Sequence, residues 1–218
     1  MVKAANALHV VLRVVAEVGG MRRRAMYKAV REASRVAALR GRFRIVHLSI
    51  QKTHVHLLVE ADTKLALARG MQGFQISAAR RINTALGDGG WRRRGRVFVD
   101  RYHLEVIRSP RHARNTLAYV LNNWRKHRED HQGRGSAWPV DPFSSGTSFA
   151  GWREPEVLAW AVPEAYEPLV VSRPRSWLLY AAWKRHGLIS AREVPGPRRR
   201  GRGTCASAAG DAGSTVRR

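Results

Sequence analysis

The sequence is poor in cysteine, in acidic residues and in long apolar runs. Its 218 residues include one cysteine, Cys205, so no disulfide can form within the chain, and this usage is typical of a reducing compartment. The apolar N-terminal stretch is broken by His9, Arg13 and Glu17, and no run of the sequence approaches the length of a membrane span. We therefore expect a cytoplasmic protein with no membrane partner.

The shortage of acidic residues is the strongest compositional signal. There are 40 lysines and arginines against 16 acidic residues, which gives a formal net charge of +24. A charge of this size repels itself in the free protein, whereas a bound polyanion neutralises it and releases condensed counterions. We expect a nucleic-acid partner and a nucleoid-associated location. The plainer alternative is a highly charged, solvated surface.

Apolar spacing divides the chain up to residue 128 into seven elements. Alternation and β-branched content predict strands at 7–18, 42–50, 54–60 and 97–107. Helices are predicted within 21–41, from a cap at Asp62 or Thr63 to the glycines at 87–90, and from Ser109-Pro110 over 110–128. The order β-α-β-β-α-β predicts an α+β, ferredoxin-like fold with a four-stranded antiparallel sheet and two helices on one face. The last helix is an addition to that fold.

Composition changes after residue 130. Residues 1–130 contain all seven elements and are expected to form one domain. Residues 131–194 are rich in Gly, Ser, Pro and aromatic residues, which predicts a loop-rich extension with a candidate short helix at 175–189, closed by Gly187. Residues 195–218 cannot build a core and are expected to be a disordered basic tail that contacts polyanions without specificity.

Two histidines stand one residue apart in the third predicted strand, within QKTHVHLLVE. On a strand, residues i and i+2 point to the same face, so His54 and His56 project together while Val55, Leu57 and Val59 take the other face. Two neighbouring imidazoles can bind one cation through their lone pairs. A His-x-His pair alone is a weak signal, and two histidines with only a structural role are the more common explanation.

The last predicted helix has a polar line beside its apolar stripe. Tyr119 lies off the stripe that Leu117 and Leu121 form, and Asn123 follows Tyr119 by one turn on the same side. Lys126 lies further along the helix. The phenol and the amide are either rim residues of an amphipathic helix or members of a site.

The segment WRRRGR, before the fourth predicted strand, joins an indole to four arginines. Arginines contact phosphates, and an exposed aromatic ring can stack on an unpaired base. The alternative is a solvated charged loop. The candidate DNA-binding residues are Trp91, Arg92, Arg93, Arg94, Arg96 and, from the last helix, Lys126.

These segments together resemble the Y1 transposases of the IS200-like type, and especially their REP-associated tyrosine transposase branch. The resemblance covers about residues 6–150, where THVHLLVE matches the HUH motif (histidine, hydrophobic residue, histidine) and LAYVLNN matches the tyrosine helix. RVFVDRYHLEVI and DPFSSG also stand where the family has similar segments. Each segment alone is a weak signal, and their order makes the set specific.

The resemblance implies a metal-dependent single-strand DNA transesterase that cleaves and rejoins DNA through a 5′-phosphotyrosine. His54 and His56 match the metal ligands, Asn123 matches an amide ligand one turn after the tyrosine, and Tyr119 matches the nucleophile. The implied cofactor is Mg²⁺, or Mn²⁺ in its place. The implied partner is single-stranded or hairpin DNA, bound by a monomer or by a homodimer that trades tyrosine helices.

Two positions depart from the family pattern. Thr53 stands where the family often has asparagine before the first histidine, and Trp124 stands where proline often follows the amide ligand. The second change predicts that the helix continues past Asn123. Neither change removes a group that the chemistry needs.

Three other functions fit parts of this pattern. Ferredoxin-like sheets bind single-stranded RNA through exposed aromatic residues, and the predicted strands contain only Phe43, Phe98 and Tyr102. RNA phosphoesterases use two His-x-Thr or His-x-Ser motifs, whereas the pair here is His-x-His. A transposase domesticated for a host role would keep the same site residues.

Overall fold

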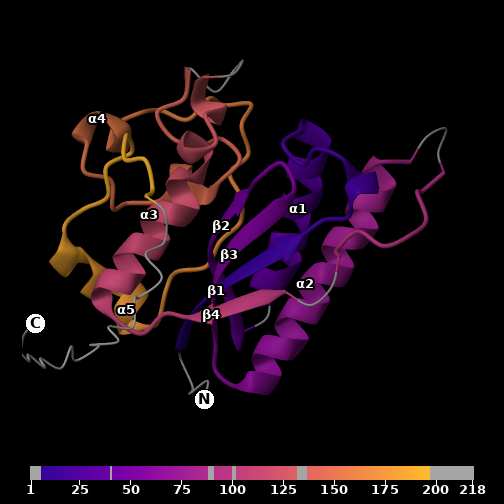
Figure 1. Cartoon of the computed structure of the whole chain (residues 1–218), viewed down its shortest axis with the longest axis horizontal. Coiled ribbons are helices and arrows are strands. Elements are labelled where there is room, and N and C mark those ends of the chain that lie inside the picture. Colours follow the sequence, from indigo (N-terminus) through magenta and orange to yellow (C-terminus); the bar gives the residue numbers. More distant parts are fainter. Residues whose placement is uncertain (1–5, 40, 88–90, 100–101, 132–136, 197–218) are drawn as a thin grey trace, which may run out of the picture.

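The predicted strands form one antiparallel sheet, and helices cover both of its faces. The computed structural model describes residues 6–39, 41–87, 91–99, 102–131 and 137–196. The strands are β1 (Asn6–Arg13), β2 (Phe43–Ile50), β3 (His54–Ala61) and β4 (His103–Val106), in the spatial order β2-β3-β1-β4. The long helices are α1 (Arg24–Ala38), α2 (Lys64–Ala85) and α3 (Pro110–Lys126). Helices α1 and α2 lie on one face and α3 on the other (Figure 1), so the predicted ferredoxin-like α+β fold with an added helix is confirmed.

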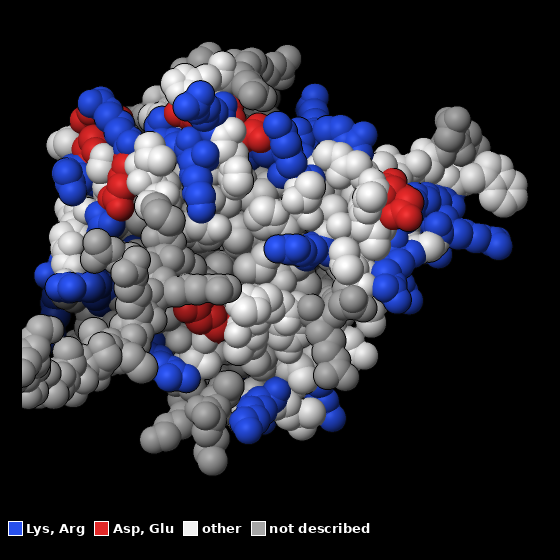
Figure 2. Space-filling model, in the orientation of Figure 1, with Lys and Arg blue, Asp and Glu red and all other residues white. Residues whose placement is uncertain are grey.

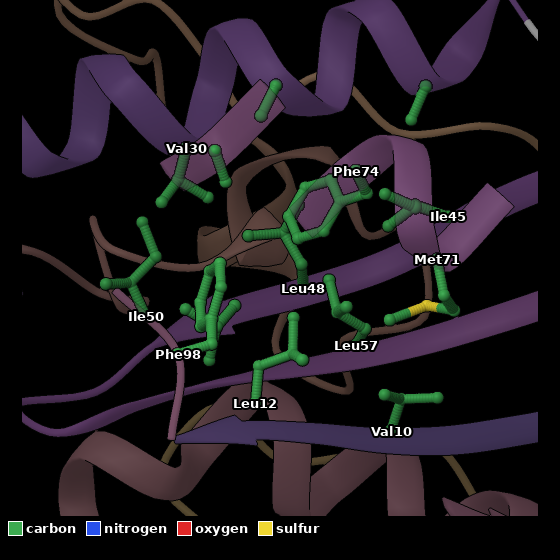
Figure 3. Close-up of a cluster of buried hydrophobic side chains, with 14 of the residues drawn as sticks. Val10, Leu12, Val30, Ile45, Leu48, Ile50, Leu57, Met71, Phe74 and Phe98 are labelled. Carbon is green, nitrogen blue, oxygen red and sulfur yellow. The ribbon is translucent and has the colours of Figure 1, made fainter. Parts of the chain in front are cut away.

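The main core lies between the sheet and the helices α1 and α2. Side chains alternate along each strand, so Leu12 of β1 and Leu57 of β3 point into the same layer, where Phe74 of α2 also lies (Figure 3). Helix α2 approaches β2 so closely that Gly70 has no room for a β-carbon, since the ring of Phe43 stands in its place. Helix α2 is therefore packed tightly against β2, the strand that pairs with the histidine-bearing strand β3.

A second apolar layer fills the space between the sheet and α3. Leu58 of β3 and Val46 of β2 belong to this layer, together with Leu117 and Leu121 of α3. These side chains occupy the face of β3 opposite to the main core. The apolar stripe of α3 thus faces the sheet surface from which His54 and His56 project.

The predicted helix signals act as expected. The Thr63 hydroxyl accepts from the backbone N–H of Ala66 at the start of α2, and the Ser109 hydroxyl accepts from that of His112 at the start of α3. Helix α3 continues through Trp124 and ends at Lys126, so the predicted continuation past Asn123 is confirmed.

Two predicted strands were too long. β1 ends at Arg13 rather than at residue 18, because the chain enters a 3-10 helix at Ala16–Val18 whose Val18 turns into the core. β4 contains only His103–Val106 of the predicted range 97–107. Phe98 pairs with Val14 in an isolated bridge, and its register differs by two residues from that of β4. The described part of this segment is therefore not one continuous strand.

The chain after α3 folds back over α3 and the edge of the sheet (Figure 1). The predicted helix at 175–189 is two short helices, α5 (Trp177–Tyr180) and a 3-10 helix at Ala182–His186, and it closes at Gly187 with φ of 86°. The other short helices are Glu129–His131, Ser145–Ser148 and α4 (Pro155–Leu158). The predicted disordered tail lies outside the described residues from position 197 onward.

Buried polar bonds attach this extension to the sheet. The carboxylate of Glu60 is fully buried and accepts from the backbone N–H groups of Arg175 and Ser176 and from the Ser176 hydroxyl. The backbone N–H of Ser172 donates to the carbonyl of Ile45 on the outer strand β2. No helix in the described ranges combines the length and the apolar character needed to cross a membrane.

Candidate active site

The two histidines of β3 project to the α3 side of the sheet and meet each other. Their Nε2 atoms are 2.9 Å apart, and the rings are perpendicular with centroids 4.5 Å apart. His56 is buried, with 3% of its surface exposed, whereas His54 is half-buried. Val55, Leu57 and Val59 lie in the main core on the opposite face, as the alternation predicted.

Helix α3 brings the predicted tyrosine and amide to this pair. The Nδ2 atom of Asn123 lies 3.1 Å from Nε2 of His56, and Asn123 is fully buried. The Tyr119 ring lies edge-on to the His56 ring, with centroids 5.2 Å apart. The Nζ atom of Lys126 lies 5.3 Å from the centroid of the Tyr119 ring. Three candidates from α3 and two from β3 therefore form one cluster.

A third histidine completes the cluster, and the sequence reasoning missed it. His9 of β1 places Nε2 at 3.1 Å from Nδ1 of His56, and its ring lies 6.1 Å from that of Tyr119. The signal that could have found it is the imidazole within the apolar stretch ALHVVL, where a buried polar group needs a partner.

The hydrogen bonds of the cluster are consistent with neutral imidazoles. Burial is the largest cause that lowers the pKa of His54, to about 4, and the positive charges of His127 and Arg13 act in the same direction. An amide nitrogen only donates, so with Asn123 in this orientation Nε2 of His56 accepts, and a neutral His56 then carries its proton on Nδ1. At neutral pH His54 therefore presents a lone pair rather than a positive charge.

The donor set fits a divalent cation. Two donor atoms that share one octahedral ion at about 2.1 Å stand about 3 Å apart, which matches the 2.9 Å between the two Nε2 atoms. The buried Oδ1 atom of Asn123 has no hydrogen-bond partner among the described residues, and half a turn of the amide exchanges it with Nδ2. Within the described ranges, no group of three or more His, Cys, Asp or Glu side chains is arranged to hold a metal. The candidate set is two imidazoles and an amide oxygen.

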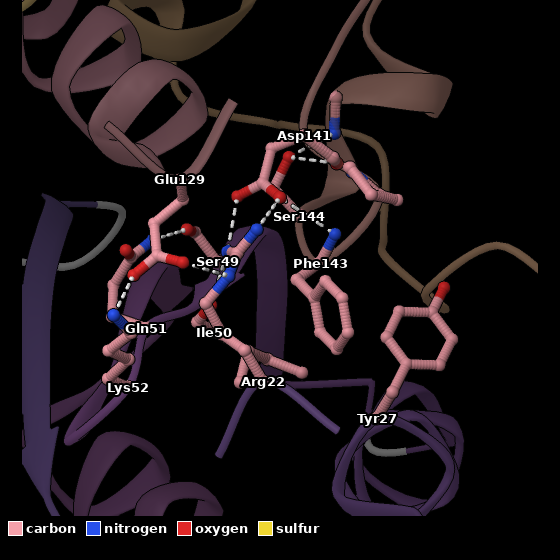
Figure 4. Close-up of polar contacts among 12 residues, drawn as sticks. Arg22, Tyr27, Ser49, Ile50, Gln51, Lys52, Glu129, Asp141, Phe143 and Ser144 are labelled. Carbon is pink, nitrogen blue, oxygen red and sulfur yellow. Dashed lines mark hydrogen bonds and ion pairs between the residues drawn. The ribbon is translucent and has the colours of Figure 1, made fainter. Parts of the chain in front are cut away.

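An ion-pair network fastens the end of α3 to the turn between β2 and β3 (Figure 4). Glu129, just after α3, lies 3.1 Å from Nζ of Lys52 and 3.7 Å from Nε of Arg22. Arg22 also donates two hydrogen bonds, of 3.0 and 2.8 Å, to the fully buried carboxylate of Asp141. Loss of one partner from a buried ion pair costs about 3–5 kcal/mol. The network therefore holds the tyrosine helix in a fixed place beside the histidine strand.

The side of α3 that faces away from the sheet is covered by the extension. The amide of Asn122 donates to the carbonyl of Ser190, and the guanidinium of Arg114 pairs with the carboxylate of Glu193. Arg125 donates to the carbonyl of Ala191. Helix α3 is therefore enclosed between its own sheet and its own C-terminal segment.

The predicted DNA-binding loop is basic, but its arginines differ in their surroundings. Trp91 is 79% exposed, and Arg92 and Arg94 are also exposed. Arg93 instead donates to the side chain of Asn83, and Arg96 donates to a backbone carbonyl of the loop. The loop protrudes beyond α2 in Figure 1, and basic side chains gather at the same place in Figure 2. Trp91, Arg92, Arg94 and Arg96 are therefore the members that face solvent, and Arg93 is half-buried.

This loop leads back to the histidine pair. The backbone N–H of Val99 donates to the carbonyl of Arg13 at the end of β1. Arg13 stands directly opposite His54 in the pairing of β1 with β3. The end of the loop therefore lies beside the residue of β1 that pairs with His54.

The chain is similar to a known family and to a solved structure. A family model described as "Transposase IS200 like" matches residues 3–123, more than half of the chain. A solved structure described as "Structure of the REP associates tyrosine transposase bound to a REP hairpin" is 15% identical, with a TM-score of 0.51. The match covers 78% of this chain and 94% of that chain, and at this identity it establishes the fold alone. No curated protein matches the chain.

Proposed function

Because the chain belongs to the IS200-like transposase family, we propose that it cleaves and rejoins single-stranded DNA through a covalent bond to Tyr119. The observation that carries the proposal is the junction of α3 with β3. Asn123 contacts His56, and one helical turn earlier the Tyr119 ring lies 5.2 Å from the His56 ring. A nucleophile and a set of candidate ligands are thus held together by two packed elements rather than by flexible loops.

The proposed reaction is a transesterification at phosphorus. The Tyr119 oxygen bonds to the scissile phosphorus, the bond to the 3′ oxygen breaks, and the 3′ oxygen gains a proton in place of the one the phenol loses. The product is a 5′-phosphotyrosine, and attack by a 3′-hydroxyl reverses the exchange. The covalent bond keeps the energy of the phosphodiester, so no nucleotide cofactor is required. The ammonium group of Lys126 lies close to the Tyr119 ring, where it can contact the negatively charged phosphate.

His54, His56 and Asn123 are the proposed ligands of a divalent cation, Mg²⁺ or Mn²⁺. Their donor spacing and the buried amide oxygen without a partner support this role. When bound, the cation supplies positive charge that stabilises the charge developing on the non-bridging phosphate oxygens. The protein's own contribution is to keep the His54 imidazole neutral and to fix Asn123 on the helix that carries Tyr119.

The proposed substrate is DNA with a hairpin and a single-stranded flank. The solved structure of the same fold is bound to a REP hairpin, which supports this class. Exposed basic and aromatic side chains at Trp91, Arg92 and Arg94 suit phosphates and unpaired bases. The proposed catalytic unit is residues 1–130, with the extension packed against it.

We also propose that the protein acts as a monomer whose Tyr119 serves its own histidines. Exchange of α3 alone would require the bonds of Asn122, Arg114 and Arg125 to the extension to break, and exchange together with the extension would break the bonds of the extension to Glu60. It would also break the ion pair between Lys52 and Glu129. The extension therefore supports action in cis.

Two other functions are less well supported. RNA-binding ferredoxin-like domains use an open sheet face, whereas here α3 packs over that face. The sequence does contain one His-x-Ser on a strand, His47-Leu48-Ser49, which a phosphoesterase would require twice. His47 is buried and bonded to Ser145, so it is not available to a substrate.

A covalent-trap experiment tests the proposal. DNA hairpins with single-stranded flanks, labelled at the 3′ end, are mixed with protein and Mg²⁺, Mn²⁺ or EDTA, and resolved on a denaturing gel. We expect a protein band that carries label only with metal, and that Tyr119→Phe and His54→Ala both lose. Tight DNA binding without any labelled protein band, under every metal condition, would replace the proposal with a non-catalytic binding function.

A further inference from the structure

His9 is a buried histidine that belongs to no motif. It lies on the central strand β1 with 1% of its surface exposed, between Leu8 and Val10, which face the main core. A buried imidazole costs free energy unless its nitrogen atoms are hydrogen-bonded. Its position therefore calls for a specific partner.

That partner is His56. Nε2 of His9 lies 3.1 Å from Nδ1 of His56, and the two rings are stacked at 24° with centroids 5.2 Å apart. The contact uses the ring nitrogen of His56 that does not face His54. Both ring nitrogens of His56 are therefore in contact with a partner. Nδ1 contacts His9, and Nε2 contacts Asn123 and His54.

The pattern of donors selects one tautomer of His56. A neutral imidazole has one N–H and one lone pair. With the amide of Asn123 in this orientation, a proton on Nε2 of His56 would point an N–H at the donor nitrogen of Asn123, and both groups would lose a bond. If Nδ1 of His56 carries the proton, it donates to Nε2 of His9. The lone pair on Nε2 of His56 then faces Asn123 and His54.

His9 has an acidic residue as its neighbour on the other side of β1. Glu105 of β4 stands directly opposite His9 in the pairing of β1 with β4, so both side chains lie on the same face of the sheet. Glu105 also lies within 3.3 Å of His112 of α3.

We propose that His9 is a positioning residue that fixes the tautomer and ring orientation of His56, so that Nε2 of His56 presents a lone pair to a divalent cation. The metal part of this inference rests on the proposed function. The tautomer itself is a property of the metal-free protein. Outer partners of ligating histidines commonly change metal affinity by about 10–100-fold.

The tautomer is measured first, in the metal-free protein, by long-range ¹H–¹⁵N correlation of the histidine rings. We expect His56 to be protonated at Nδ1 in the wild type, and to gain the Nε2–H form in His9→Leu. A wild-type His56 protonated at Nε2 overturns the inference, whether or not any variant folds. The tautomer measurement needs neither metal nor DNA, whereas the labelled-adduct gel tests the proposed reaction. Failure of this inference and failure of the proposed function can therefore be told apart.

Metal affinity is measured second, by titration with Mn²⁺ followed by electron paramagnetic resonance. His9→Leu should bind Mn²⁺ about 10–100-fold more weakly, and His9→Gln, which keeps an acceptor, should recover part of the loss. His47→Leu is the matched control, because His47 is also buried in the sheet but is bonded to Ser145 instead. Unchanged Mn²⁺ affinity in a folded His9→Leu, or an equal loss in His47→Leu, overturns the inference.

Discussion

The amide of Asn123 lies 3.1 Å from Nε2 of His56, so the tyrosine helix touches the histidine strand at the centre of the site. This contact couples two elements that are 67 residues apart in sequence. Tyr119 is one turn from Asn123, and a shift of either group would therefore move the other. The site depends on the docking of α3 as much as on its individual side chains.

Replacement of Asn123 should weaken metal binding without unfolding the protein. We expect Asn123→Ala to bind Mn²⁺ about 10-fold or more weakly, because an oxygen ligand is lost beside two imidazoles. Asn122→Ala is the matched control, since Asn122 is equally buried on the same helix but donates to Ser190. That control should lose about 1–3 kcal/mol of unfolding free energy and no Mn²⁺ affinity. Normal Mn²⁺ binding by Asn123→Ala would remove it from the ligand set.

A mixing experiment should show that the nucleophile acts in cis. Tyr119→Phe and His56→Ala are each expected to form no covalent adduct, and an equimolar mixture of the two should form none either. If chains exchanged α3, mixed dimers would contain one complete site and the labelled band would return. Return of the band, scaled to the fraction of mixed dimers, would contradict the monomer.

Substitutions in the loop after α2 should separate DNA contacts from loop structure. Trp91→Ala should weaken binding to a single-stranded flank by about 1–3 kcal/mol, the usual contribution of one stacked base. Arg92→Ala should reduce the slope of the logarithm of the binding constant against the logarithm of salt concentration by about 1, the effect of losing one phosphate contact. Arg93→Ala should instead destabilise the loop, because Arg93 bonds to Asn83. Fluorescence anisotropy at several salt concentrations measures the DNA affinity of each variant. Equal losses of affinity, with equal salt dependence, in all three variants would argue against direct stacking by Trp91.

The stability of the protein should fall as pH drops from 7.5 to 5. Burial lowers the pKa of His47 to about 4, from 6.5 in the unfolded chain, so below 6.5 the unfolded state binds the extra proton. This group therefore contributes stability above its unfolded pKa that is lost as pH falls toward the folded pKa. The loss from His47 amounts to about 2 kcal/mol at pH 5. Urea unfolding of wild type and His47→Gln should show a smaller pH dependence in the variant, and equal slopes would contradict the buried neutral imidazole.

Much of the fold follows from local sequence signals. Alternation in HVHLLVE gave the correct faces of β3, because one face is buried in the main core and a one-residue shift would expose it. The capping residues Thr63 and Ser109 predicted the starts of α2 and α3, since their hydroxyls satisfy free backbone N–H groups. The helical spacing of Tyr119 and Asn123 predicted that both lie on one side of α3.

The remainder depends on tertiary contacts that local patterns do not contain. His9 was missed because its role arises from the pairing of β1 with β3, which places it diagonally beside His56. Arg93 has the same local sequence as its neighbours, and only the position of Asn83 turns it inward. The enclosure of α3 by the extension rests on bonds between residues about 70 positions apart, such as Asn122 and Ser190.

The most direct test of the account is to locate the nucleotide on the protein. The chain has five tyrosines, and Tyr119 is the one beside the histidine cluster, whereas burial raises the pKa of Tyr27 and of Tyr166. The labelled adduct formed with Mn²⁺ is digested with protease and nuclease, and the modified peptide is sequenced by mass spectrometry. We predict a 5′-phosphonucleotide on Tyr119 and on no other residue. A nucleotide found on another tyrosine, or on a serine or histidine, would contradict Tyr119 as the nucleophile.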